Sequence, residues 1–191
     1  TFKSRIRRCF QLLIRIIYII VDMLAVKEHH YFYESPIGKI LLSFKNEALQ
    51  GLWFEGQKYY ASNLGRESLL KLSPATKKVI QWLDMYFSGD SPEIDFPLFL
   101  DGTDFRMKVW KALETIPYGK VVTYSELASS IYDKPFAGNM ARAVGGAVGH
   151  NPISIIVPCH RVVGAKDNLT GYAGGLWRKS YLLDLEKSFL K

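Results

Sequence analysis

The sequence predicts an α/β fold in two domains: a small N-terminal α/β domain with an antiparallel sheet, and a helical C-terminal domain with a helix-turn-helix. Three observations support this prediction. Short β-rich runs follow one another over 29–54, a stretch rich in Pro, Gly and Asp covers 88–102, and the later segments have the apolar spacing of helices. At 191 residues, with 48% hydrophobic and 23% charged residues, the chain can bury a globular core in one domain or two small ones.

Three β-rich runs open the N-terminal domain, and they cover 30–33, 39–44 and 49–54. Turn-forming residues at 35–38 and 46–47 separate these runs, so we expect an antiparallel meander. Ser73 and Pro74 then begin a helix, because proline suits the first helical position. We expect this helix to end at Gly89.

The second half is expected to be helical, with helices over 103–113, 124–131, 138–148 and 176–189. Thr123 and Glu126 have the spacing of a capping box at the start of the second of these helices. A turn through 133–135 leads to the third, and two short helices joined in this way suggest a helix-turn-helix. A β-like run is expected at 153–157. We place the domain boundary at 102, which gives an N-terminal domain over 23–102 and a C-terminal domain over 103–191.

The formal net charge of +7 suits a polyanionic partner without identifying one. Residues 1–22 carry five basic side chains against one acid, so the rest of the chain carries only +3. The apolar stretch in this leader, 10–21, is shorter than the roughly 20 residues that a membrane span needs. We expect Met23 to be the natural start and 1–22 to lie upstream of the protein proper; an amphipathic surface anchor is the alternative.

The two cysteines, Cys9 and Cys159, lie far apart, and the first belongs to the doubtful leader. A structural disulfide is therefore not expected, and a reducing compartment is the default. With four histidines and no CxxC pair, the chain offers few ligands for zinc, so we expect no metal site.

The segment 138–148 combines a buried stripe with an unusually bare opposite face. Arg142 lies on that outer face together with Gly145 and Gly146. Each glycine inside a helix costs on the order of 1 kcal/mol relative to alanine, so the bare face needs a reason. Close packing of two helices is one reading. A helix pressed against a nucleic-acid groove, with Arg142 reaching in, is the reading that better explains a single cation among glycines.

Glu186 falls in the apolar stripe of the last helix, where Leu182 and Leu183 precede it. A carboxylate in that position should be partly buried, and a buried charge needs a partner. The alternative from this helix alone is a frayed last turn in which Glu186 faces water.

The run Val157-Pro158-Cys159-His160-Arg161 places a thiol beside a possible base. Only the thiolate is a good nucleophile, and a neighbouring base or cation generates it. Adjacent residues in extended chain point to opposite sides, so a bridging water is more plausible than a direct bond between Cys159 and His160. A cysteine that merely packs in the core is the alternative. Pro158 should end the preceding strand and leave Cys159 at a bend.

Pro158-Cys159-His160-Arg161, followed by Val-Val-Gly, closely resembles the active-site signature of the O6-alkylguanine-DNA alkyltransferases. The segments 141–147, 151–152 and 171–175 match that family as well, at the right spacing. These motifs cover most of 103–191, whereas the match over 29–100 is looser and rests on layout. The resemblance implies an α/β N-terminal domain and a C-terminal domain with a winged-helix-like helix-turn-helix that binds DNA in the minor groove.

The resemblance also implies a role for each site residue. Cys159 would be the alkyl acceptor, His160 its base through a water, and Glu186 the carboxylate that orients His160. Tyr172 would donate to the O6 atom, and Asn151 would fix the segment before the active-site turn. Contacts to DNA are implied for a further set, in which Arg142 fills the stack after base flipping and Tyr124 presses on the target phosphate; the set is Thr123, Tyr124, Ser125, Arg142, Gly145, Gly146 and Arg161.

The implied activity is DNA repair by stoichiometric, irreversible transfer of the alkyl group from O6-alkylguanine, and from O4-alkylthymine, to Cys159. No cofactor is needed. We expect a monomer that binds double-stranded DNA without stable membrane association, in the cytoplasm or, in a eukaryote, the nucleus. Two rival classes remain from the residues alone. A DNA-binding regulator would use Cys159 only for packing, and a cysteine hydrolase or redox enzyme would turn over many times.

Overall fold

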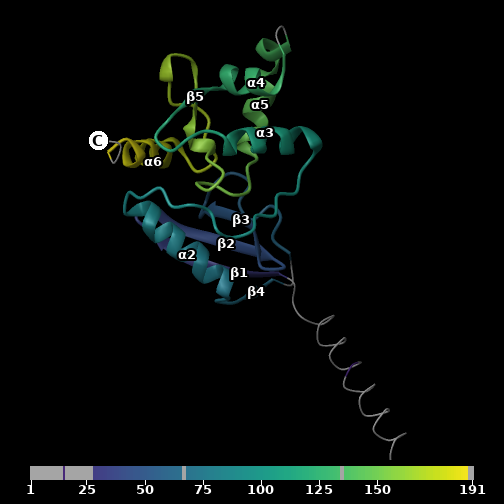
Figure 1. Ribbon diagram of the computed structural model, residues 1–191, viewed down its shortest axis with the longest axis vertical. Helices are drawn as coiled ribbons and strands as arrows, with labels where there is room; N and C mark the ends of the chain where they lie inside the picture. The colour runs from purple at the N-terminus through teal and green to yellow at the C-terminus, as the bar shows by residue number, and fades with distance from the viewer. Residues whose placement is uncertain (1–14, 16–27, 66–67, 134–135, 189–191) are drawn as a thin grey trace, which may run out of the picture.

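The computed structural model describes residue 15 and residues 28–65, 68–133 and 136–188 (Figure 1). The leader 1–22, with Cys9, and the start expected at Met23 lie outside these residues, apart from residue 15. Within the described ranges, no helix has both the length and the apolar character required for a membrane span.

The N-terminal domain is a four-stranded sheet in the order β3-β2-β1-β4, covered by one helix (Figure 1). The strands are β1 Glu28–Ser35, β2 Gly38–Lys45, β3 Ala48–Phe54 and β4 Leu69–Leu70. The first three form the expected antiparallel meander, and Asn46 and Glu47 close the second hairpin with φ of 50° and 62°. The short β4, which runs parallel to β1, was not expected from the sequence.

Helix α2 (Pro74–Phe87) begins where the sequence predicts. The Ser73 side chain accepts a hydrogen bond from the backbone N–H of Thr76, and Pro74 occupies the first turn of the helix. Its apolar side, which includes the fully buried Val79 and Leu83, packs in the core cluster shared with the strands. Gly89, at φ 99°, follows the helix and turns the chain away, as expected.

The C-terminal domain is helical, with α3 Asp104–Glu114, α4 Tyr124–Ile131, α5 Phe136–Gly149 and α6 Leu176–Ser188. The capping box of Thr123 and Glu126 is present at the start of α4. Helices α4 and α5 pack against each other as the helix-turn-helix predicts. Beside them, β5 (Val122–Thr123) pairs in parallel with β6 (Val162–Val163).

The expected strand at 153–157 is wrong. The segment is a series of turns whose one ladder contact is an isolated bridge between Leu52 and Ile153. Ile155 has a φ of 68°, which is incompatible with an extended strand and rare for a β-branched residue. The apolar run is buried because it passes between the two domains. Its apolar residues therefore reflect this burial and not a β-strand, which is why the sequence pattern was misleading.

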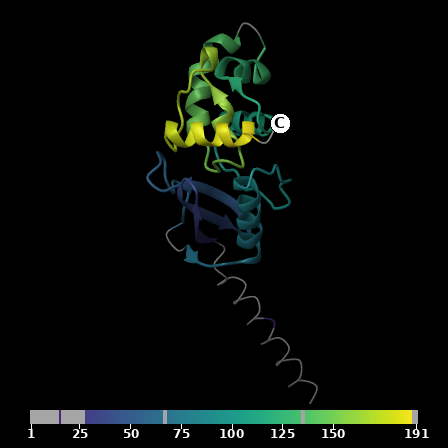
Figure 2. The same cartoon turned by 90° about the vertical axis from the view of Figure 1, so that its left-hand side faces the viewer.

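Backbone hydrogen bonds join the two domains at this segment. Leu52 in β3 donates to Pro152 O at 2.8 Å, and Ser154 donates back to Leu52 O at 3.0 Å. Buried side chains of both domains belong to one continuous cluster. In the view of Figure 2, helix α6 lies across the lower side of the C-terminal domain, facing the sheet. The turn that follows 153–157 is therefore held between both domains.

Candidate active site

Cys159 begins a short 3-10 helix, η1 (Cys159–Arg161), directly after Pro158. Its side chain is buried, with 4% of the residue exposed. The side-chain amide of Asn151 donates to Sγ at 3.1 Å and to Val157 O at 2.8 Å. Asn151 Oδ1 also accepts from the backbone of Ile153 at 3.0 Å. One amide thus ties the end of α5 to the turn that carries the thiol.

Burial raises the pKa of the Cys159 thiol, while the hydrogen bond from Asn151 and the positive charge of Lys179 act in the opposite direction. The resting group is therefore a thiol. A nucleophile at this position needs a base to take its proton when it attacks.

His160 is fully buried and points its ring at Glu186, with Nε2 and Oε1 2.7 Å apart. Because the carboxylate can only accept, Nε2 carries the proton and donates to it. Nδ1 is buried and has no hydrogen-bond partner within the described chain. Burial lowers the pKa of His160, against the opposing effect of Glu186, so the ring is neutral and Nδ1 has a free lone pair.

Glu186 is fully buried and accepts from several donors besides His160. These are Tyr86 Oη at 2.8 Å, the Gly119 backbone N–H at 2.9 Å, and Arg161 Nε at 2.9 Å. Burial alone would raise the pKa of Glu186, but its contacts with His160 and Arg161 lower it to about 2. The carboxylate is thus ionised and its charge is balanced, which excludes the frayed helix end left open by the sequence.

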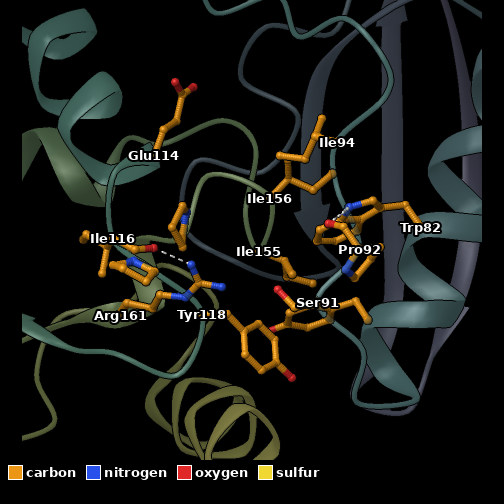
Figure 3. Close-up of a pocket in the computed structure, with 13 residues that line it drawn as sticks. Trp82, Ser91, Pro92, Ile94, Glu114, Ile116, Tyr118, Ile155, Ile156 and Arg161 are labelled. Atoms are coloured by element: carbon orange, nitrogen blue, oxygen red, sulfur yellow. Dashed lines mark hydrogen bonds between the residues drawn. The ribbon is translucent and has the colours of Figure 1, made fainter. Parts of the chain in front are cut away.

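Arg161 was expected among the DNA contacts, and the structure places its guanidinium inside the protein. It forms the ion pair with Glu186, and its Nη1 donates to Ile116 O at 2.6 Å. Figure 3 shows this guanidinium beside Ile116 and Tyr118 at a pocket of about 240 Å³ between the two domains. The pocket is lined by Pro158 but not by Cys159.

Tyr172 lies near the thiol on the loop that follows η1. Its hydroxyl is buried and makes no hydrogen bond of normal geometry in the described structure, although the Ser154 side chain lies near enough to act against the rise in its pKa. Burial, followed by the charge of a Cys159 thiolate, raises the pKa of Tyr172 well above its usual value. Tyr172 therefore remains a protonated donor.

The face of α5 opposite the core is open. Val144, Ala147 and Val148 are buried, as the sequence stripe predicts, while Arg142 is exposed. A Cβ added at Gly146 would meet no atom within 4 Å. Close packing of two helices is therefore excluded as the reason for Gly146, whereas Gly145 lies against the Tyr124 ring of α4.

Tyr124 connects α4 with both α5 and the Tyr172 loop. Its hydroxyl donates to Gly171 O at 3.0 Å, and its ring lies 3.6 Å from a Cβ added at Gly145. Ser125, next along α4, is exposed, and Thr123 is engaged in the capping box. These residues line one edge of the helix-turn-helix.

Two polar residues of the site were missed by the sequence reasoning. Tyr86 comes from α2 in the other domain, and nothing in its sequence context indicates a contact with Glu186. Lys179 is fully buried, and its ammonium group donates to Val162 O and to Thr170 O. Burial lowers the pKa of Lys179 to about 8. Its spacing was a usable signal, because Lys179 and Glu186 are seven residues apart on one helix face.

A metal centre finds no support in the described residues, since no group of three or more His, Cys, Asp or Glu side chains gathers among them. The nucleophile, its neutral histidine and the ionised carboxylate are instead arranged for proton transfer between protein groups.

Two family models together match nearly all of the described chain. The model described as 6-O-methylguanine DNA methyltransferase, DNA binding domain, matches residues 104–188. The model described as the ribonuclease-like domain of 6-O-methylguanine DNA methyltransferase matches residues 29–100.

Curated relatives and solved structures agree with these models. The methylated-DNA–protein-cysteine methyltransferase of Mycobacterium tuberculosis is 47% identical over 160 residues, which is 84% of this chain and 93% of the relative. The corresponding protein of Haemophilus influenzae is 42% identical over 160 residues, covering 83% of this chain and 86% of the relative. The crystal structure of Mycobacterium tuberculosis OGT in complex with DNA superposes with a TM-score of 0.74 at 45% identity, covering 84% of this chain and 94% of that one.

Proposed function

Since the chain belongs to the 6-O-methylguanine DNA methyltransferase family, we propose that Cys159 is the residue that accepts the alkyl group. The protein binds DNA and repairs O6-alkylguanine by direct, single-turnover transfer of the alkyl group to a cysteine of its own. Cys159 is the one cysteine among the described residues, and it directly precedes His160, whose buried ring is paired with the buried Glu186. That arrangement is the observation that carries the assignment.

The chemistry is one displacement step. Sγ of Cys159 forms a bond to the alkyl carbon as the bond from that carbon to O6 breaks, and the thiol proton passes through a bridging water to Nδ1 of His160. Glu186 holds the ring in the tautomer that leaves Nδ1 free, and Arg161 balances the carboxylate charge. Tyr172 donates a hydrogen bond to O6, which stabilises the guanine anion as it leaves.

Access to the base requires that it leave the duplex. The open face of α5 enters the minor groove, where Arg142 fills the stack and Tyr124 presses on the phosphate of the flipped nucleotide. Thr123, Ser125 and the glycines of α5 complete the contact with double-stranded DNA. The protein acts as a monomer, needs no cofactor and works in the cytoplasm or, in a eukaryote, the nucleus. O4-alkylthymine is a further substrate of the same site.

Intact-protein mass after incubation with a duplex that contains O6-methylguanine tests the assignment. The expected result is a single added methyl group, about 14 Da, that maps to Cys159 and is absent in Cys159→Ser. Bound DNA with no change in protein mass would identify a damage reader instead, and continued product formation beyond one equivalent would identify a hydrolase.

Arg142→Ala tests base flipping in the same assay. Transfer from the duplex should slow by about tenfold or more, because the extruded base then competes with restacking. Lys77→Ala, which removes an exposed charge from α2, is the matched control. Equal rates for the two variants would remove Arg142 from the flipping step.

A further inference from the structure

A loop of the N-terminal domain reaches the end of α5. The ring of Tyr59 stacks on His150, with centroids 3.9 Å apart and planes at 24°. Nδ1 of His150 lies 2.7 Å from Gly146 O, so the imidazole is attached to the last turn of α5. Tyr59 has a φ of 61°, a region that residues other than glycine adopt at a cost of roughly 1 kcal/mol or more. The surrounding contacts must therefore hold the ring in place.

The same loop also contacts the segment that carries Tyr172. The backbone N–H of Lys58 donates to Ala173 O at 3.0 Å. Within the loop, the Lys58 ammonium group lies over the Tyr59 ring, 4.9 Å from its centre. Residues 58 and 59 thus connect the end of α5 with the loop after η1, although they belong to the other domain.

These contacts enclose a hollow of about 260 Å³. Lys58 and Tyr59 form one wall, Tyr172 and Ala173 form another, and the glycines of α5 form the floor. The floor is empty above Gly146 and Gly149, where an added Cβ would meet no atom within 4 Å. The hollow opens between the DNA-facing helix and the tyrosine whose buried hydroxyl lacks a partner.

We propose that Tyr59 is a substrate-binding residue, whose ring forms the N-terminal-domain wall of the pocket that receives the flipped O6-alkylguanine. The inference rests on the proposed function and adds to it a residue from the domain that carries neither the thiol nor the DNA-binding helices. A flipped base is held by contact with aromatic side chains, and the Tyr59 ring, stacked on His150 by one face, is held in the lining of the hollow before the base arrives. The backbone of Lys58 joins this wall to the opposite one through its hydrogen bond to Ala173 O.

The test compares two substrates that share the base but not the duplex. Alkyl transfer to Cys159 is timed with a duplex that contains O6-methylguanine and with O6-benzylguanine as the free base, whose benzylic carbon reacts readily in a displacement. Affinity for an undamaged duplex of the same length is measured in parallel. The variants are Tyr59→Ala and Tyr59→Phe, with Phe32→Ala as a control that removes an aromatic ring of similar exposure, 41% against 38%, from β1.

Tyr59→Ala should lower both transfer rates by about fivefold or more, as expected for the loss of one aromatic contact to a base. Tyr59→Phe, which keeps the ring, should stay within about twofold of wild type, and affinity for undamaged duplex should not change. If Tyr59→Ala folds poorly, Tyr59→Gly suits the left-handed backbone and removes the same ring.

Three outcomes contradict the inference. Unchanged transfer rates in both the Ala and the Gly variants overturn this inference but not the proposed function, because the protein then transfers the alkyl group without the Tyr59 ring. A fall confined to the duplex, matched by weaker binding of undamaged DNA, makes Tyr59 a contact to the DNA backbone instead. A wild-type chain that gains no alkyl group from either substrate overturns the proposed function and this inference together.

Discussion

The side-chain amide of Asn151 donates a hydrogen bond of 3.1 Å to Sγ of Cys159, and both residues are buried. The same amide holds Val157 O, and its oxygen accepts from Ile153. A single side chain thus connects the end of α5, the irregular segment 153–157 and Cys159 itself. Alkylation places a new group on the sulfur that this amide contacts.

Asn151→Ala should impair both stability and repair. It leaves the buried N–H of Ile153 without an acceptor, which costs about 1–3 kcal/mol, whereas Val157 O keeps the backbone N–H of Cys159 as a donor. We expect the free energy of unfolding to fall by about 1–3 kcal/mol in urea denaturation. The thiol pKa should rise further, because the hydrogen bond that lowers it is lost.

Asn168→Ala is the matched control, since Asn168 is exposed and lies in the loop after η1. Its unfolding and transfer rate should equal those of the wild type. An Asn151→Ala variant that unfolds like the control would show that the segment before Cys159 does not depend on the amide.

Glu186→Gln should change the pH dependence of alkyl transfer. The contact with Glu186 raises the pKa of His160, in opposition to burial, so its removal lowers that pKa. Transfer requires neutral His160 and is lost as pH falls through the pKa of the folded protein. The acid limb of the rate profile should therefore move to lower pH in Glu186→Gln, while the rate on the plateau falls because the base is weaker.

Stopped reactions over a series of pH values, read by protein mass, give this profile. Tyr86→Phe, which removes one neutral donor to Glu186 and leaves its charge, should keep the acid limb close to that of the wild type. An acid limb that moves to higher pH in Glu186→Gln would show that His160 is not the group that titrates.

Stability should also fall in acid because of Glu186. Its pKa is about 2 in the folded protein against a reference value of 4.5, so the unfolded chain binds a proton first as the pH falls. The stabilisation is complete above 4.5 and is lost between that value and about 2; the shift corresponds to on the order of 3 kcal/mol. Burial lowers the pKa of His160 as well, and its loss of stability sets in at higher pH, below 6.5.

Urea denaturation of wild type and Glu186→Gln over this pH range separates the two groups. The wild type should be more stable near neutral pH, and the difference should shrink as the pH falls below 4.5. A constant difference down to low pH would mean that Glu186 titrates no differently in the folded and unfolded chains.

The sequence predicted the elements whose local rules are strong. The meander, the start of α2 at Ser73 and Pro74, and the capping box of Thr123 are set by turn and cap chemistry, and they were confirmed. The segment 153–157 failed because a continuous apolar run indicates burial, not the backbone conformation that achieves it.

Within the site, patterns in the sequence predicted some of the residues but not the contacts between them. Cys159 and His160 were identified because they are neighbours in the sequence. Glu186 was identified because it falls in the apolar stripe of the last helix. The partners of Glu186 could not be predicted, because Tyr86 reaches it across the domain junction and Gly119 uses a backbone N–H. Such contacts follow from tertiary packing, which no spacing rule within one segment encodes.

Gly146→Ala should stabilise the protein while it slows repair. Gly146 lies inside α5, where alanine is favoured by about 0.5–1 kcal/mol, and its added Cβ would meet no protein atom within 4 Å. The methyl group would instead occupy the floor of the hollow, on the face of α5 that we propose contacts DNA. The unfolding temperature should therefore rise by a few degrees, while the rate of alkyl transfer from duplex O6-methylguanine falls.

Ala143→Gly is the control, at an exposed position of the same helix. It should lower the stability of the protein and leave the floor of the hollow unaltered. A Gly146→Ala protein that is more stable and repairs at the wild-type rate would show that the bare glycine is not kept for the substrate.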